Sequence, residues 1–275
     1  MPPSPPSSAQ TLLSWHWPWR HAGLLRQFVR RQVQARYRGT LLGVAWSLLT
    51  PLLMMTVYTL VFRYVFKMRW AGGADTGFDF ALRLFAGMTV FGFFSEVLLL
   101  SPTLIVAQPN LVKKVRFPVE ILPWVTVLSS LVFALPGVGL LLFACLLLGM
   151  PVHAAWLALP LIWLPLVPML LGLGWLLSAV GVFVRDVGQV LGLVVTLLQF
   201  LSPVFYPVTA LPLRLRPLMY LNPLTPVIEQ SRAALFAGQW PPPGIWLLQL
   251  LAAALVALAG GWTFRRLRGG FADVL

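Results

Sequence analysis

The sequence predicts an all-α polytopic membrane protein with six transmembrane helices. Of its 275 residues, 59% are hydrophobic and 10% are charged, whereas about a quarter of the residues of a typical soluble domain are charged. The mean hydropathy is +0.85, and a soluble domain of this length does not bury so much apolar surface. The net charge of +13 comes from short basic clusters between apolar runs, which argues against a nucleic-acid-binding face.

The N-terminal region contains a Pro/Ser-rich stretch and then a basic helix. Residues 1–19 are predicted to be disordered, and they contain no evident signal peptide because the first long apolar run begins near Leu41. Residues 20–40 combine an apolar stripe with arginines, a pattern typical of an amphipathic helix in the headgroup plane beside anionic lipid. A merely solvated basic flank is the alternative. The arginines assigned to this interfacial helix are Arg26, Arg30, Arg31, Arg36 and Arg38.

Six apolar runs are long enough, or nearly long enough, to cross a bilayer, which takes about 20 helical residues. They are Leu41–Phe66, Leu82–Val106, Leu122–Leu148, Trp156–Val184, Val190–Phe205 and Ile245–Phe264, within a transmembrane domain at 41–264. The fourth run contains Pro160, Pro165 and Pro168, so kinks are expected there. The fifth run is short.

The distribution of basic residues predicts that both termini are cytoplasmic. With the N-terminus inside, the cytoplasmic side holds the arginines of residues 20–38, the basic residues of 113–116, Arg185 and the basic tail 265–275. The opposite side holds Arg63, Lys67, Arg69, Arg83, Arg214, Arg216 and Arg232. The cytoplasmic side thus receives the larger share of Lys and Arg, as the positive-inside rule requires.

A proline-broken stretch at 202–232 separates the last two apolar runs. It contains Pro203, Pro207, Pro212, Pro217, Pro223 and Pro226. Proline removes a backbone donor, and irregular backbone at membrane depth survives only against protein or a water-filled cavity. The stretch therefore indicates a re-entrant element on the external side. An ordinary external loop resting on helix ends remains the alternative.

Most catalytic chemistry is absent from the sequence. No phosphate-cradling glycine loop followed by lysine occurs, so the chain is not expected to bind ATP or to act as an enzyme. The three histidines are too scattered for a metal site, and Asp75 and Asp79 are interpreted as solvated loop charges. Glu96 is the one acid well inside an apolar run, where a carboxylate needs a cavity or a partner. A structural or water-lined position is favoured over proton coupling.

The segment 108–120 joins the second and third apolar runs. Between Pro109 and Pro118 it alternates apolar residues with Lys113, Lys114 and Arg116. This pattern is typical of a short, rigid helix on the membrane face that is presented to a cytoplasmic partner. A positive-inside anchor without a partner is the alternative.

Five motifs in chain order carry a family resemblance. They are Arg30–Gln32 with Tyr37–Gly43 and Trp46–Leu48, then Leu111–Pro118, Val184–Gln189, Leu201–Pro207, and Asn222–Pro226 with Arg232. Together they resemble the membrane permease subunit of bacterial polysaccharide-export ABC transporters, type-2 exporters of the O-antigen, capsule or teichoic-acid kind.

The resemblance implies a homodimer in the bacterial cytoplasmic membrane, paired with two copies of a separate P-loop ATPase that binds ATP and Mg. No cofactor is expected in this chain, and the substrate is a lipid-linked glycan. The residues that match the ATPase-coupling elements are Asn110, Lys113, Lys114, Arg116, Phe117, Pro118, Arg185 and Asp186. Those that match the external gate are Pro203, Pro207, Asn222, Pro223, Pro226, Glu229 and Arg232.

A glycan path is expected to use aromatic faces, which stack on sugars and tolerate sliding. The candidates for channel lining are Tyr58, Phe62, Phe91, Phe94, Glu96, Phe200, Phe205 and Tyr206. Packing against lipid or the protein core is the alternative for each phenylalanine.

Two other functions remain open. An ABC exporter for a drug or a lipid shares the same architecture and differs in having a narrow or closed cavity. A membrane-embedded glycosyltransferase acting on polyprenyl phosphate requires an acidic or histidine constellation near one face, for which only Asp75 and Asp79 are available.

Overall fold

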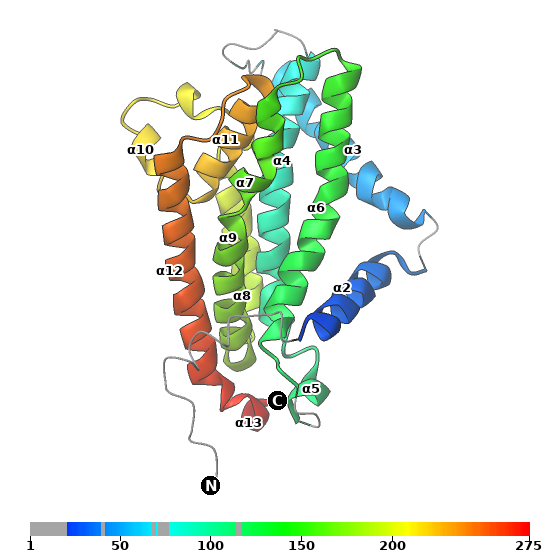
Figure 1. Cartoon of the computed structure of the whole chain (residues 1–275), viewed down its shortest axis with the longest axis vertical. Coiled ribbons are helices and arrows are strands. Elements are labelled where there is room, and N and C mark those ends of the chain that lie inside the picture. Colours follow the sequence, from blue (N-terminus) through cyan, green and yellow to red (C-terminus); the bar gives the residue numbers. More distant parts are fainter. Residues whose placement is uncertain (1–20, 40–41, 66, 68–69, 71–76, 114–116) are drawn as a thin grey trace.

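The computed structural model of the protein describes residues 21–39, 42–65, 67, 70, 77–113 and 117–275. Over these residues the chain forms helices and connecting loops without a strand (Figure 1). The first half contains α2 (Ala22–Tyr37), η2 (Gly43–Ala45), α3 (Trp46–Thr59), η3 (Leu60–Val65), α4 (Gly77–Leu100), η4 (Ser101–Thr103), α5 (Pro109–Lys113) and α6 (Ile121–Leu147). The second half contains η5 (Ala154–Ala158), α7 (Leu159–Trp163), α8 (Leu166–Phe183), α9 (Val187–Leu201), η6 (Val208–Ala210), α10 (Arg216–Met219), α11 (Leu224–Phe236), α12 (Pro243–Arg268) and α13 (Phe271–Val274). The predicted disordered stretch 1–19 lies outside the described residues.

Five helical segments in the described part of the chain are long and apolar enough to cross a membrane. They are Trp46–Val65, Phe78–Thr103, Ile121–Leu147, Ala154–Phe183 and Pro243–Arg268. Each overlaps one of the predicted spans, so the multi-pass prediction is confirmed. The remaining predicted span corresponds to α9, which is apolar but has 15 residues and ends before Ser202. It ends there because Pro203 has no N–H with which to continue the helix.

The two ends of the bundle carry different elements (Figure 1). Helices α2, α5 and α13 and the C-terminus lie toward one end, which we call the α5 end. The loops around α10 and the start of α12 lie at the other, which we call the α10 end. The long helices run between these ends, so α5 and α10 lie at opposite ends of the bundle.

Prolines divide the fourth predicted span into three helical pieces, as the expected kinks required. Pro165 lacks the N–H that would bond to the Leu161 carbonyl one turn earlier, and α7 ends at Trp163. The Trp246 indole of α12 donates to the Leu161 carbonyl at 2.7 Å. The Leu161 carbonyl thus accepts from a neighbouring helix as well as from the Leu164 N–H at 3.3 Å, although Pro165 offers it no donor.

Helix α8 lies at the centre of the bundle because its glycines allow other backbones to approach closely. A Cβ on Gly172 would lie 2.3 Å from the Val256 carbonyl oxygen of α12, and one on Gly260 would lie 1.9 Å from the Gly172 carbonyl oxygen. On another side, a Cβ on Gly181 would lie 2.3 Å from the Pro102 carbonyl oxygen. Small residues at helix contacts are the usual means of tight packing in lipid.

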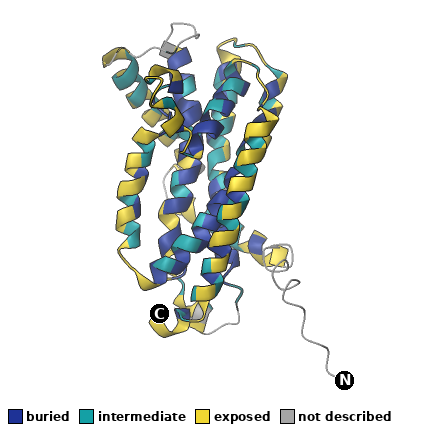
Figure 2. Cartoon of the chain, turned by 90° about the vertical axis from the view of Figure 1, so that its left-hand side faces the viewer, coloured by how far each residue is buried: buried dark blue, intermediate teal, exposed yellow. Residues whose placement is uncertain are grey.

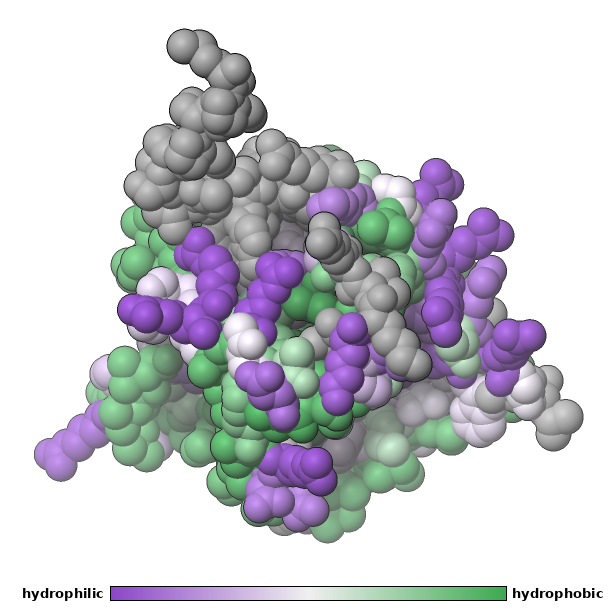
Figure 3. Space-filling view, turned by 90° about the horizontal axis from the view of Figure 1, so that it is seen from below, coloured by the Kyte–Doolittle hydropathy of each residue, from purple (hydrophilic) through white to green (hydrophobic). Residues whose placement is uncertain are grey.

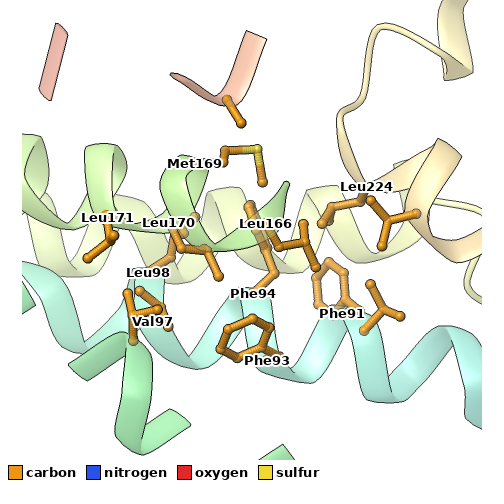
Figure 4. Packing of buried hydrophobic residues seen from close by; sticks show 14 of the residues in the cluster. Phe91, Phe93, Phe94, Val97, Leu98, Leu166, Met169, Leu170, Leu171 and Leu224 are labelled. Carbon is orange, nitrogen blue, oxygen red and sulfur yellow. The ribbon is translucent and has the colours of Figure 1, made fainter. Parts of the chain in front are cut away.

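Large apolar side chains fill the space between α4 and α8 (Figure 4). Phe93, Phe94 and Val97 of α4 belong to the same buried cluster as Leu166 and Leu170 of α8. Figure 2 shows that buried residues line the inside of the bundle while exposed ones cover its outer faces. Cys145 is buried and free, as expected for a packing residue.

Asp79 is a correction to the sequence analysis, which placed it as a solvated loop charge. It lies in the first turn of α4, it is buried, and its carboxylate oxygen is 3.0 Å from Arg83 Nε. A carboxylate is favourable at a helix N-terminus, and an arginine four residues later is within reach on the same face. Asp75 lies outside the described residues.

Candidate functional site

The proline-broken stretch folds back into the bundle. Helix α11 begins at Leu224, which belongs to the same buried cluster as Phe91 near the middle of α4 (Figure 4). Further along α11, Arg232 bonds to Arg83 in the first part of α4, and Leu235 packs with Leu82. Helix α11 therefore runs antiparallel to α4, from the middle of the bundle toward the α10 end.

Arg232 holds the turn after α9 against α4. The guanidinium donates to three main-chain carbonyls: that of Arg83 at 2.8 Å, that of Pro203, and that of Val204 at 2.6 Å. It also pairs with Glu229 at 3.1 Å and lies over the Trp70 ring, 4.4 Å from its centroid. One side chain thus satisfies acceptors that the irregular backbone around Pro203 exposes.

Burial lowers the pKa of Arg232 to about 10, while the Glu229 carboxylate acts in the opposite direction. The group therefore stays charged at neutral pH. A buried charge requires several hydrogen-bond acceptors, and this one has them.

Gly87 makes room for this arrangement. A Cβ at this position of α4 would lie 2.5 Å from Arg232 Nη2 and 3.3 Å from the Val204 Cα. Any larger residue would push the guanidinium away from its carbonyls. The sequence analysis missed Gly87, because a helical glycine carries no signal for what packs on it.

Asn222 joins the end of α9 to the start of α11. Its Nδ2 donates to Ser202 Oγ at 2.7 Å, and its Oδ1 accepts from the Leu224 N–H at 3.0 Å. Ser202 Oγ in turn donates to the Leu198 carbonyl at 2.6 Å. An Asn side chain that bonds to the main chain two residues later starts a turn, and this one opens α11.

Two tryptophans hold the other end of α11. Trp156 Nε1 donates to the Leu235 carbonyl at 3.0 Å, and Trp163 Nε1 donates to Ser231 Oγ at 3.2 Å. Among the residues predicted as an external gate, Arg232 bonds to Glu229 and to the Pro203 carbonyl, and Asn222 bonds to Ser202; these bonds and their partners are called the re-entrant network. Of the predicted gate residues, Pro203, Pro207, Pro226 and Arg232 are buried, Asn222 and Glu229 are half-buried, and Pro223 is exposed.

Aromatic side chains gather where this network meets α3. The Phe205 ring lies 5.1 Å from the Tyr58 ring, 4.7 Å from the Phe62 ring and 5.5 Å from the Phe200 ring, between centroids. Tyr206 donates its hydroxyl to the Phe200 carbonyl at 2.6 Å. The sequence placed these residues on three separate segments, and the fold brings them together.

The eight predicted lining residues divide into two groups. Phe91, Phe94 and Phe205 are 5%, 4% and 1% exposed, so in this chain they belong to the core and do not reach an open face. They are buried because α8 and α11 cover α4, and because the turn after α9 packs on α3. Tyr58, Phe62, Glu96 and Tyr206 are half-buried, and Phe200 is exposed.

Glu96 faces both a cavity and a partner. It lines a cavity of about 500 Å³ between α3, α4 and α6, together with Arg36, Ser47, Thr50 and Thr89. Arg36 of α2 makes an ion pair with its carboxylate. The partner comes from outside the apolar helices, which is why a search of the spans alone did not reveal it.

Helix α2 packs on the start of α6 through one side. Leu25 is buried with Ile121 and Val125, and Phe28 and Val29 pack against the same cluster. The five predicted arginines of this helix and the residue after it are all exposed. Seen from the α5 end, hydrophilic side chains gather across much of the face around more hydrophobic ones (Figure 3).

The predicted coupling residues lie at the same end. Asn110 and Lys113 are exposed on α5, and Phe117 and Pro118 are half-buried. The Phe117 ring lies 5.2 Å from the Phe28 ring of α2. Lys114 and Arg116 lie outside the described residues.

The second predicted cytoplasmic turn joins α8 to α9. Arg185 and Asp186 are exposed there, and the Asp186 carbonyl accepts from the Gln189 and Val190 N–H groups at 3.0 and 3.1 Å. Helix α5, this turn and the re-entrant network belong to the same helical bundle. Over the residues with described positions, no three His, Cys, Asp or Glu side chains gather as metal ligands.

Comparison with known proteins identifies the family. The family model described as "ABC-2 type transporter" matches residues 23–236. The chain is 31% identical over 266 residues to the O-antigen export system permease protein RfbA of Myxococcus xanthus, covering 93% of this chain and 96% of that protein. It is 22% identical over 253 residues to a protein of the same name from Klebsiella pneumoniae, covering 92% and 95%.

A further relative is the polysialic acid transport protein KpsM of Escherichia coli. It is 25% identical over 240 residues, covering 86% of this chain and 90% of that protein. The family model's match spans α2 from its second residue, the α5 segment and the re-entrant network. This chain therefore belongs to the ABC-2 type transporter family, as a membrane permease subunit.

Proposed function

We propose that this chain is the membrane channel subunit of an ATP-driven transporter that exports a lipid-linked polysaccharide across the bacterial cytoplasmic membrane. The relatives' names, O-antigen export and polysialic acid transport, support the substrate class. The structural observation that carries the proposal is that two distinct features lie in different parts of one helical bundle. A re-entrant network held by Arg232 lies toward the α10 end, and α5, on which Asn110 and Lys113 are exposed, lies at the α5 end.

In this proposal the chain crosses the membrane six times, with both termini in the cytoplasm. Helix α9 is the additional span. Its 15 residues rise about 22 Å, which is less than the 30 Å of a typical hydrocarbon core. The re-entrant turn at Ser202 and Pro203 takes up the remaining depth. Helix α2 then lies along the cytoplasmic surface, where its exposed arginines meet anionic lipid.

The working unit in this proposal is a homodimer. The apolar span Trp46–Val65 has no buried residue within this chain, although it is long enough to cross the membrane. Helix α9 likewise exposes Leu193, Leu197 and Phe200. A second copy covering these faces would place Tyr58, Phe62, Phe200 and Tyr206 beside a path between the subunits, with Phe91, Phe94 and Phe205 supporting them from behind.

Two copies of a separate P-loop ATPase supply the energy, and ATP and Mg bind to that partner. The partner contacts Asn110, Lys113, Lys114, Arg116, Phe117 and Pro118, and the turn at Arg185 and Asp186. ATP closes the two ATPase subunits on each other, and the closed state fits one arrangement of the permease pair better than the other. The population of the permease states shifts by that difference in affinity.

The path is opened by movement of the re-entrant network. Arg232 and Asn222 tie the turn after α9 to α11, so that this part of the chain moves as one body. Aromatic faces stack on sugar rings without fixing any one of them, which suits a polymer that slides. Glu96 contributes a carboxylate side chain to the α4 wall of the cavity.

Reconstitution of the permease with a P-loop ATPase that co-purifies with it tests this function. Proteoliposomes receive a fluorescent undecaprenyl-diphosphate-linked oligosaccharide, and its movement is measured with and without ATP. We expect transport only when both subunits and ATP are present, and none with an ATPase variant that binds but does not hydrolyse ATP. Transport by the permease alone, or ATP-driven movement of a drug or phospholipid without movement of the glycan, would overturn the proposal.

A further inference from the structure

The C-terminal segment of the chain lies against the proposed coupling segment. Helix α12 ends at Arg268, and the short helix α13 follows and contacts both α5 and α8. Figure 1 shows α13 and α5 next to each other at the same end of the bundle. The sequence predicts residues 265–275 only as a basic cytoplasmic tail, and such a tail would not be expected to pack against α5.

An ion pair anchors the start of this contact. Arg268 pairs with Glu120, whose side chain is 9% exposed and which is the last residue of the segment 108–120, at the N-terminus of α6. The main-chain carbonyl of Glu120 also accepts from the buried Trp175 indole of α8 at 3.1 Å. Glu120 Oε2 is buried and has no hydrogen-bond partner among the residues that the structure describes. The ion pair with Arg268 therefore offsets much of the cost of burying this carboxylate.

A buried aromatic ring anchors the end of the contact. Phe271 of α13 is fully buried between the Phe183 ring of α8, at 6.0 Å, and the Phe264 ring of α12, at 5.5 Å. Leu275 packs against the same apolar cluster, as does Leu111 of α5. Phe271 and Leu275 thus hold the segment after α12 against the core, whereas chain termini are usually poorly ordered unless they are held.

The coupling segment is held from the other side as well. The Phe117 ring contacts the Phe28 ring of α2, so the segment lies between the N-terminal helix and the C-terminal segment. A segment that transmits movement from a partner must be firmly attached to the bundle. A loosely attached segment would move by itself, and the bundle would stay in place. The two ends of the chain supply that attachment from opposite sides.

We propose that Arg268, Glu120 and Phe271 are positioning residues for coupling: they brace α5 so that movement of the partner ATPase reaches α6 and α8. This inference rests on the proposed function, because it assumes that α5 receives the partner. It adds a role for the C-terminal segment 269–275, which acts through α5 and not by contact with substrate.

The first test is local and needs no partner. Leu111→Cys is placed in a chain with Cys145→Ala, and its rate of maleimide labelling is measured in membranes. We expect slow labelling in the full-length chain. Removal of residues 269–275 or Phe271→Ala should raise the rate several-fold, because α5 loses the helix that packs against it. The matched control is Val274→Ala, an exposed residue of the same helix. Equal labelling rates in the full-length chain, the truncated chain and the Phe271→Ala and Val274→Ala chains would overturn the proposal.

The second test measures coupling in the reconstituted complex. Arg268→Ala and Glu120→Gln should lower the amount of glycan moved per ATP hydrolysed at least about fivefold, with co-purification of the ATPase retained. The charge-exchanged pair Glu120→Arg with Arg268→Glu should recover part of that loss. The control is Arg266→Ala, whose guanidinium lies over the Trp262 ring, 5.4 Å from its centroid.

The two proposals fail in different ways. If the unmodified complex does not couple ATP to glycan movement, the proposed function fails while the labelling result still decides the packing role. If the unmodified complex couples and Arg268→Ala, Glu120→Gln and Arg266→Ala couple equally well, the bracing role is wrong and the function stands. Variants that do not insert are replaced by Arg268→Lys, which keeps the charge and should retain intermediate coupling.

Discussion

Arg36 in the last turn of α2 makes an ion pair with Glu96, which stands in the apolar helix α4. The same guanidinium lies over the Phe133 ring of α6, 4.1 Å from its centroid. One arginine thus joins the N-terminal helix to two long helices. A carboxylate inside an apolar span is costly, and a partner from the surface helix reduces that cost without placing a second charge in a span.

Breaking this pair should weaken the attachment of α2. Arg36→Ala leaves the carboxylate without its partner, whereas Glu96→Gln removes the charge and keeps an acceptor. We expect Arg36→Ala to lower the midpoint of thermal unfolding in detergent more than Glu96→Gln. A double-mutant cycle should give a coupling energy of about 0.5–3 kcal/mol. Arg30→Ala, in an exposed position of the same helix, is the control, and additive effects of the two changes would contradict the pair.

Gly87→Ala should disturb the re-entrant network. The new methyl would lie 2.5 Å from Arg232 Nη2, so the guanidinium must move away from its carbonyls. We expect a loss of stability of about 1–3 kcal/mol, typical of overpacking. Gly92→Ala on the same helix meets nothing within 4 Å and should be neutral or stabilising by up to about 1 kcal/mol, because alanine favours the helix. Thermal unfolding of both variants in the same detergent compares them, and equal losses would contradict the close approach.

Gly260→Ala should separate α8 from α12. Its Cβ would lie 1.9 Å from the Gly172 carbonyl oxygen, and a backbone atom cannot rotate away as a side chain can. We expect a loss of at least about 1–3 kcal/mol, seen as a lower unfolding midpoint and a reduced yield of folded protein. Gly139→Ala in α6 meets nothing within 4 Å and serves as the control. An unchanged midpoint for Gly260→Ala would mean that the two helices pack less closely.

The long helices could be predicted from the sequence, because apolar runs of bilayer length depend only on local composition. Their ends were less well placed, since α4 begins at Gly77 and not at Leu82. Proline chemistry likewise indicated the break in the fourth span and the end of α9. What the sequence could not show was the direction of α11. That direction depends on Arg232 reaching the Arg83 and Val204 carbonyls, which are contacts between distant parts of the chain.

Pairing between distant residues also explains the other differences. Glu96 was correctly expected to face a cavity or a partner, but Arg36 lies 60 residues away in the sequence and is one of several similar arginines. Asp79 was misplaced because the predicted apolar run begins at Leu82, whereas α4 begins at Gly77 and includes a polar first turn. Phe91 and Phe94 were predicted to line the channel only because they are aromatic. Whether an aromatic ring faces the core depends on which helix covers it, and periodicity within one helix does not show that.

Arg232→Lys should destabilise the re-entrant network although the charge is kept. A lysine ammonium cannot reach three carbonyls in different directions as the guanidinium does. Each buried acceptor left without a donor costs about 1–3 kcal/mol, so we expect a loss of at least about 2 kcal/mol. Arg214→Lys, exposed at the α10 end, should have little effect. Thermal unfolding measures the loss, and faster proteolysis between residues 208 and 221 should accompany it.

Charge reversal at Lys113, Lys114 and Arg116 together should uncouple ATP hydrolysis from export. These residues lie in the segment proposed to contact the partner ATPase, and Lys113 is exposed at the end of α5. Changing all three to Glu replaces attraction by repulsion at that contact, so the amount of glycan moved per ATP should fall at least about tenfold, within the usual range of coupling between sites. A triple variant that keeps every charge, with Lys113→Arg, Lys114→Arg and Arg116→Lys, should transport normally. Because positive charge also orients membrane helices, accessibility of the C-terminus must be shown to be unchanged. Normal transport by the reversed variant, correctly inserted and bound to the ATPase, would place the coupling contact elsewhere on the α5 end.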